Sequence, residues 1–308
     1  MAFTVQYQTV QANGSAIFNI PGSVSSYIVG ISNFSFTFGN TDHHVQQLSL
    51  SLGLPGQPMS TADQTQIPVQ VQATLSDASG HMIDSAQSSV TVAILAWTGA
   101  ASAQVMLESA TVNNNQNTSI PVPTGTPVSG LQSIVSGFDL AYPSGVDHDV
   151  QAVGIGISAL SQTQGFASLG GNASMNDASG NYCNGSGGTT ATVTGSLLAT
   201  SLSSPGLVMQ ALLQQQTNDV SVNLGTTLAD AVVLITGFQL QYPGSVDHWI
   251  KTIGAGPTSY KLWGGPPVSP YNANVEIFNA QALMSDNSGH SQDNTASNVS
   301  LVVIGVPL

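Results

Sequence analysis

The chain has 308 residues, and only 6% of them are charged, against roughly 25% in an average soluble domain. Two Lys and no Arg stand against 15 acidic residues, which gives a formal net charge of −13. So few cations cannot neutralise phosphate groups, which argues against nucleic acid and anionic membrane surfaces as partners. No apolar run approaches 18 residues, so membrane insertion is not expected.

Six strands are predicted in the first hundred residues, because short alternating segments rich in Val, Thr and Phe are separated by turn residues. They cover residues 3–10, 15–20, 27–38, 45–52, 68–75 and 89–97. The alternation is clearest where Phe34, Phe36 and Phe38 point to one face of the third strand. Residues 208–219 have good local helix propensity, but their counterparts in residues 3–14 alternate like a strand. We therefore expect a strand in both places.

An aromatic strand followed by Asp-His occurs three times, as FSFTFGNTDHHV (34–45), FDLAYPSGVDHDV (138–150) and FQLQYPGSVDHWI (238–250). A second motif follows each copy: LSDASGHMID (75–84), MNDASGNYCN (175–184) and MSDNSGHSQD (284–293). The Asp of the first motif recurs after 105 and then 100 residues, from Asp42 to Asp147 to Asp247, which is a domain length.

The repeat predicts an all-β protein of three tandem antiparallel β-sandwich domains, jelly-roll-like and about 100 residues each. Their expected boundaries are 1–99, 100–204 and 205–308, at joints where the alternation stops and small residues collect. The sequence leaves open whether the domains lie in a row or around a pseudo-three-fold axis. A homo-oligomer is a further possibility.

The two motifs should share one end of each domain if neighbouring strands alternate in direction, which would gather Asp and His side chains on a rim. The candidate rim residues are Asp42, His43, Asp77 and His81 in repeat 1; Asp147, His148 and Asp177 in repeat 2; and Asp247, His248, Asp286 and His290 in repeat 3. We expect Asp42, Asp147 and Asp247 to play the same local role in all three domains, which is to fix the loop that faces Asp77, Asp177 and Asp286.

Three interpretations of the rim remain open. The first is structural, because Asp-x-Ser-Gly is a common tight-turn sequence. The second is a Ca²⁺ site, for which Asp42, Asp77 and Asp84 are the candidate ligands; no other cofactor is expected. Zinc in all three repeats is disfavoured, because Asn181 stands where repeats 1 and 3 have His.

No catalytic residues are predicted. Adjacent Asp and His residues point to opposite sides of a continuous strand, and no Gly-rich phosphate loop leads into a helix. Four aromatic residues are candidate contacts for a ligand or partner: Trp249, Tyr260, Trp263 and Tyr271. Cys183 is the single cysteine, so no intrachain disulfide can form, and we expect a loop thiol.

The run GFDLAYPSGVDHDVQAVGIGIS (137–158) is similar to the closing strands of H-type lectins, small β-sandwich domains that work as trimers. The similarity covers about a quarter of each repeat. It implies glycan binding and carries over no individual binding residue.

Two functions are consistent with the sequence, neither enzymatic. The first is a recognition protein, lectin- or adhesin-like, that binds glycans or another polar surface through its loops. The alternative is a structural subunit of a filament, a capsid decoration or another large assembly of its own copies. A surface built from Ser, Thr, Asn, Gln and Gly suits an extracellular or particle-associated protein, although the first ten residues contain no recognisable secretory signal.

Overall fold

The computed structural model describes residues 2–61, 63–123, 128, 130–161, 165–202, 206–215, 218–244, 246–262 and 274–308. Every regular element in these residues is a β-strand, and all the paired strands are antiparallel, which confirms the all-β prediction. No helix in the described part of the chain is long and apolar enough to cross a membrane.

The strands follow one another in an equivalent order in the three repeats, apart from two short two-residue strands, β5 and β13. Repeat 1 contains β1 (Ala2–Gln11), β2 (Ser15–Pro21), β3 (Val24–Thr37), β4 (Gln47–Gly53), β5 (Met59–Ser60), β6 (Gln64–Ser76) and β7 (Ser89–Thr98). Repeat 2 contains β8 (Val105–Asn113), β9 (Gln116–Pro121), β10 (Gly130–Ala141), β11 (Ala152–Ser161), β12 (Phe166–Asn176), β13 (Tyr182–Cys183) and β14 (Thr190–Thr200). Repeat 3 contains β15 (Val208–Gln215), β16 (Val220–Asn223), β17 (Leu228–Gln241), β18 (Thr252–Leu262), β19 (Asn274–Ser285) and β20 (Asn298–Pro307).

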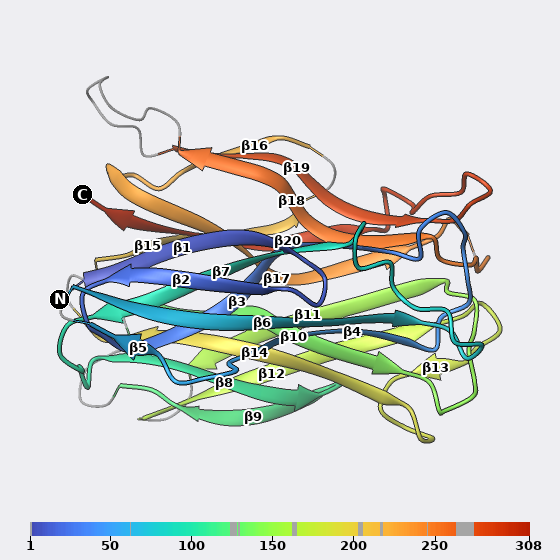
Figure 1. The fold of residues 1–308 in the computed structure, drawn as a ribbon, viewed down its shortest axis with the longest axis horizontal. Helices are drawn as coiled ribbons and strands as arrows, with labels where there is room; N and C mark the ends of the chain where they lie inside the picture. The colour runs from blue at the N-terminus through green and yellow to red at the C-terminus, as the bar shows by residue number, and fades with distance from the viewer. Residues whose placement is uncertain are drawn as a thin grey trace.

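Each of the three sheets combines strands of two repeats, three from each in the first sheet and four with three in the other two (Figure 1). The first has the order β1-β7-β3-β18-β19-β16, and the second has the order β2-β6-β4-β10-β14-β8 with β5 beside β6. The third runs β13-β12-β11-β17-β20-β15, with β9 also paired to β12. The sequence repeat did not predict that each sheet would contain strands of two repeats; tandem domains would have kept each sheet within one repeat.

Three seams join the repeats: β4 with β10, β11 with β17, and β18 with β3. They connect repeat 1 to 2, repeat 2 to 3 and repeat 3 to 1, so the repeats follow one another around a closed ring. Of the two arrangements that the sequence left open, the strand order is that of a pseudo-three-fold.

Glycine allows close approach of backbones at every seam. A Cβ added to Gly137 would lie 2.8 Å from the carbonyl oxygen of Leu50, and one added to Gly237 would lie 2.8 Å from that of Ile155. At the third seam a Cβ on Gly254 would lie 2.4 Å from the carbonyl oxygen of Phe34. Backbone cannot move aside as a side chain can, so any larger residue would push the joined repeats apart.

Three phenylalanines at equivalent positions meet in the core. The ring centroids of Phe34, Phe138 and Phe238 lie 5.3–5.7 Å apart, and all three side chains are buried. A β-bulge precedes each ring, between Ile31 and Asn33 in repeat 1 and at the matching positions of the other two. The hydrophobic core is therefore continuous across the repeats.

Candidate functional site

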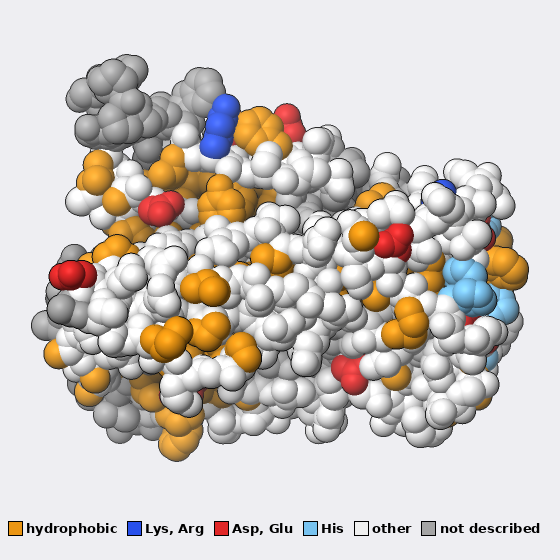
Figure 2. Space-filling view, viewed as in Figure 1, with side chains coloured by type: hydrophobic (Ala, Val, Ile, Leu, Met, Phe, Trp, Pro, Cys, Tyr) orange, Lys and Arg blue, Asp and Glu red, His pale blue; other side chains and the backbone are white. Residues whose placement is uncertain are grey.

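All the rim residues gather at one end of the molecule, where Figure 2 shows the histidines clustered. The strands run along the long axis, and both chain termini lie at the opposite end (Figure 1). The connections after β3, β10 and β17 thus meet the connections after β6, β12 and β19.

The Asp of the first motif bonds to a turn of a neighbouring repeat, not to a turn of its own. Asp147 Oδ2 accepts the backbone N–H of Ala78 at 2.9 Å, and Asp247 Oδ2 accepts that of Ala178 at 3.0 Å. Asp42 Oδ2 accepts the backbone N–H of Asn287 at 2.9 Å, which closes the ring. The three carboxylates thus make equivalent hydrogen bonds, each from one repeat to a turn of another.

The His that follows each of these Asp residues points back to its own repeat. His43 Nδ1 lies 3.4 Å from Asp77 Oδ2. The equivalent contacts are 3.1 Å from His148 to Asp177 and 3.2 Å from His248 to Asp286. Adjacent side chains on an extended backbone point in opposite directions, so one Asp-His pair reaches two different turns.

Each of these turns is built around a buried carboxylate. Asp77 Oδ1 accepts the backbone N–H groups of Ser79 at 2.9 Å and His81 at 2.8 Å, while Oδ2 lies 2.5 Å from His81 Nδ1. Asp286 and His290 reproduce this geometry. In repeat 2 the place of His81 is taken by Asn181, whose Nδ2 donates to Asp177 Oδ2 at 2.6 Å.

Hydrogen bonds lower the pKa of these buried carboxyls. Burial acts to raise the pKa of Asp77, Asp177 and Asp286, but the bonds from the turn outweigh it and the net pKa falls below the ordinary value. The main donors to Asp77 and Asp286 are His81 and His290. Asp77, Asp177 and Asp286 are therefore ionised at neutral pH, and each accepts hydrogen bonds from its own turn.

The residues that follow the Asp-His pairs meet one another. His44 Nε2 lies 3.1 Å from Asp149 Oδ1, and the His44 ring meets Trp249 edge to face with centroids 5.0 Å apart. Burial raises the pKa of Asp149; His44 opposes the rise and Asp247 adds to it. The three repeats carry different residues here, so this contact is not repeated.

The predicted Ca²⁺ ligands do not converge. The described residues contain two groups of three potential ligands, namely His43 with Asp77 and His81, and His248 with Asp286 and His290. Neither group includes Asp42 or Asp84, because Asp42 bonds to repeat 3 and Asp84 Oδ1 caps its own turn at the N–H of Ala86.

The aromatic candidates lie in different environments. Trp249 is 47% exposed beside the rim, whereas Tyr260 is buried and packs on Tyr7 with centroids 4.7 Å apart. Burial raises the pKa of Tyr260, and its ring cannot reach a ligand. Trp263 and Tyr271 fall outside the described residues. Cys183 is buried in β13, not exposed in a loop, and burial raises its pKa to about 12.

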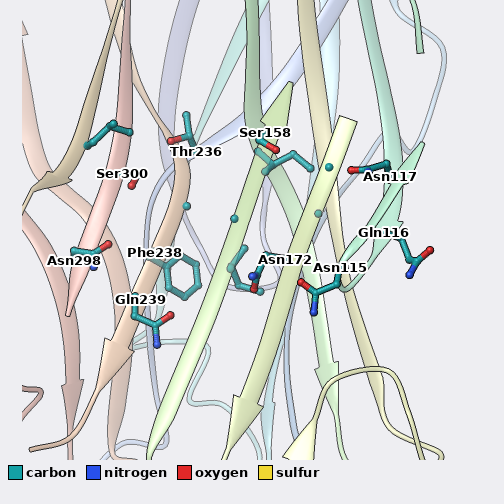
Figure 3. A pocket seen from close by; sticks show the side chains of 17 residues that line it. Asn115, Gln116, Asn117, Ser158, Asn172, Thr236, Phe238, Gln239, Asn298 and Ser300 are labelled. Carbon is teal, nitrogen blue, oxygen red and sulfur yellow. The ribbon is translucent and has the colours of Figure 1, made fainter. Parts of the chain in front are cut away.

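A groove that sequence reasoning missed crosses the outer face of the third sheet, with a volume of about 520 Å³ (Figure 3). It spans the seam between β11 of repeat 2 and β17 of repeat 3. Its polar walls are neutral: Asn115, Gln116, Asn117, Ser158, Asn172, Thr236, Gln239, Asn298 and Ser300. None of the residues that line it carries a charge.

Glycines shape the floor of the groove. A Cβ on Gly156 would meet only the Cβ of Asn172, at 4.0 Å, so the space above this residue is open. A Cβ on Gly170 would lie 2.7 Å from Asn117 Oδ1 and 3.0 Å from Ser158 Oγ. Gly170 thus lets these two polar groups lean over the sheet.

The polar walls are available to a ligand. Within the described residues, the structure shows no hydrogen bond from the side chains of Asn117, Asn172, Gln239 or Asn298 to the rest of the protein. A second hollow of about 610 Å³ shares Asn115 and Gln116 with the groove and extends the uncharged surface toward Asn184.

No known protein family matches the chain, and no curated protein matches it.

Proposed function

We propose that the protein recognises an uncharged, hydroxyl-rich ligand, a glycan or an equally polar surface, and that it does so without catalysis. The observation that carries this proposal is the neutral polar groove between repeats 2 and 3. Its volume lies in the range of small-ligand sites, about 300–1,000 Å³.

The chemistry of the walls fits sugar hydroxyls. A hydroxyl group both donates and accepts hydrogen bonds, and each Asn or Gln amide offers two donors and an acceptor. Four such amides, on Asn117, Asn172, Gln239 and Asn298, lie along the groove. A charged ligand would find no counter-charge there, and anions would also be repelled by the net charge of −13.

In this proposal each repeat of about 100 residues is one sandwich-like unit, and three units are fused into a ring. Polar recognition of this kind suits an extracellular or particle-associated protein. Weak sites on linked units or on several copies would gain avidity from their linkage.

The proposal is tested by filling the groove. Gly156→Val adds bulk above the floor, where the nearest atom is the Asn172 Cβ, so the fold should tolerate it. Gly53→Val is the matched control, because its Cβ would meet only the Gln70 carbonyl oxygen at 3.8 Å on a different sheet. Parent and variants are screened on a glycan array, and the hits are measured by calorimetry.

We expect Gly156→Val to abolish or weaken binding at least tenfold, while Gly53→Val binds like the parent. Asn172→Ala and Gln239→Ala should each weaken binding, because they remove hydrogen-bonding groups from the walls. Equal binding by Gly156→Val and the parent would refute the assignment of the groove.

A structural role is the second candidate, and exposed apolar side chains favour it. Leu54 and Met59 flank the connection after β4, and Leu160 and Phe166 flank the equivalent connection after β11, all exposed. These connections lie at the end opposite the rim, where Figure 1 places β5. Light scattering separates the two functions: filaments or large particles support assembly, and a monodisperse small species supports recognition.

A further inference from the structure

We propose that the rim binds two zinc ions, one in repeat 1 and one in repeat 3, and none in repeat 2. The proposed ligands of the first site are His43, Asp77 and His81, whose Nδ1, Oδ2 and Nδ1 atoms face one another. His248, Asp286 and His290 supply the same atoms in the second site. In each site the three residues each offer one potential ligand atom, and these atoms lie within 4.8 Å of one another.

The distances suit a tetrahedral ion after one small movement. Zinc binds imidazole nitrogen and carboxylate oxygen at about 2.0–2.2 Å, which places two ligand atoms about 3.4 Å apart. His43 Nδ1 and Asp77 Oδ2 are already 3.4 Å apart, and the matching pair in repeat 3 is 3.2 Å apart. The contact between His81 and Asp77, at 2.5 Å, must lengthen by roughly 1 Å to reach that separation.

The histidine that must move is the more exposed one of each site, which has room to rotate. The His81 side chain is 56% exposed and that of His290 is 55% exposed, whereas the His43 and His248 side chains are largely covered. The two rings of the first site are stacked with centroids 4.0 Å apart. Rotation of the outer ring turns its Nδ1 toward the ion and leaves a fourth position for water.

The rest of the site is held rigid. Asp77 Oδ1 accepts two backbone N–H groups, so Oδ2 is fixed in its orientation toward the histidines. Phe38 packs edge-on against the His43 ring with centroids 4.9 Å apart. Such surrounding contacts orient the ligands and raise the affinity of a metal site.

Repeat 2 provides a natural control. Asn181 replaces the outer histidine there and still donates to Asp177 Oδ2 at 2.6 Å, so the turn is retained without a second imidazole. His148 and Asp177 alone leave only two ligands, too few for a zinc site. The substitutions His81→Asn and His290→Asn therefore copy a residue that this turn already accepts.

The experiment is calorimetric titration of the full chain with zinc chloride, followed by the same titration of the variants. We expect two ions per chain for the parent, one for either single variant and none for the double variant. Asn181→His should raise the number to three. Circular dichroism checks that each variant keeps its strands.

The proposal is overturned if the double variant binds as many zinc ions as the parent, or if Asn181→His adds none. Binding of zinc that calcium chloride displaces at equal concentration would also overturn it, because imidazole sites do not favour hard cations. Failure to bind zinc at the rim would not bear on the proposed glycan binding in the groove, because the two sites share no residue.

Discussion

Replacing Asp147 by Ala removes one of the three carboxylates that lock the repeats together. Its Oδ2 accepts the N–H of Ala78 in repeat 1 at 2.9 Å, and its Oδ1 lies 3.4 Å from His44 Nδ1. Both contacts cross the seam between repeats 1 and 2, so the variant weakens the ring and leaves the core of each repeat intact.

The expected cost is about 1–2 kcal/mol in the free energy of unfolding. A hydrogen bond to a charged group contributes about 1.5–3 kcal/mol, and Ala78 is exposed, so water replaces part of the lost bond. The partly exposed contact with His44 adds about 0–1 kcal/mol. For a cooperative unit of this size, 1 kcal/mol lowers Tm by about 2 °C.

Urea and thermal unfolding of the variant measure this cost. Asp63→Ala is the control, because that side chain is exposed and makes no hydrogen bond within the described residues. Asp42→Ala and Asp247→Ala should cost about the same as Asp147→Ala, with or without chelator. The reasoning fails if Asp147→Ala lies within about 0.5 kcal/mol of the control, or if a chelator abolishes the difference between parent and variant.

Two further predictions concern acid and the core. Stability should fall below about pH 4, because Asp77, Asp177 and Asp286 have lowered pKa values in the fold and lose their contribution as pH drops through those values. Asp149, whose pKa is raised, offsets part of the loss, and a pH series of urea melts on Asp77→Asn should be flatter than that of the parent. Phe138→Ala should cost about 3–5 kcal/mol in the same assay, with all three repeats melting together because the ring touches its counterparts in both neighbours.

The strands could be predicted from the sequence because alternation reports burial directly. The strand predicted at residues 15–20 spans Ser15–Pro21 in the structure, and the strand predicted at 89–97 spans Ser89–Thr98. The alternation changes phase once, within β19: Asn279 has a positive φ of 44°, and Ile277 is buried where strict alternation from Ala280 would bury Phe278.

The sharing of sheets could not be predicted in this way. Alternation shows which face of β4 is buried, but it does not show which strand lies beside it. Repeats with similar patterns offer equivalent edges: β4 pairs with β6 of its own repeat on one side and with β10 of the next repeat on the other. Which strand of another repeat lies at the free edge of β4 depends on how the three repeats are arranged in space.

The groove escaped sequence analysis for a related reason. Its walls come from β9 with the turn before it, β11 and β12 of repeat 2, and from β15, β17 and β20 of repeat 3, and no short motif connects them. Asn, Gln and Ser are also common throughout this chain. The rim could be predicted, because Asp-His recurs as a sequence motif. The turn that each Asp contacts could not, because it belongs to a neighbouring repeat.

A single repeat should not fold as a monomer. In residues 100–204 alone, β10 would lose its pairing with β4 over five residue pairs, and β11 would lose its pairing with β17. Phe138 would lose the rings of both Phe34 and Phe238. An exposed edge and an exposed apolar patch both favour association.

The two free edges of that repeat match each other. β11 holds the position in repeat 2 that β4 holds in repeat 1, and β4 is the strand that pairs with β10. One copy can therefore offer β11 to the β10 of the next, and such head-to-tail contacts close after three copies in the geometry of the intact chain. We expect light scattering of residues 100–204 to give three times the monomer mass, or an insoluble product. A folded monomer with strand content like that of the parent would show that the ring is not needed for the fold.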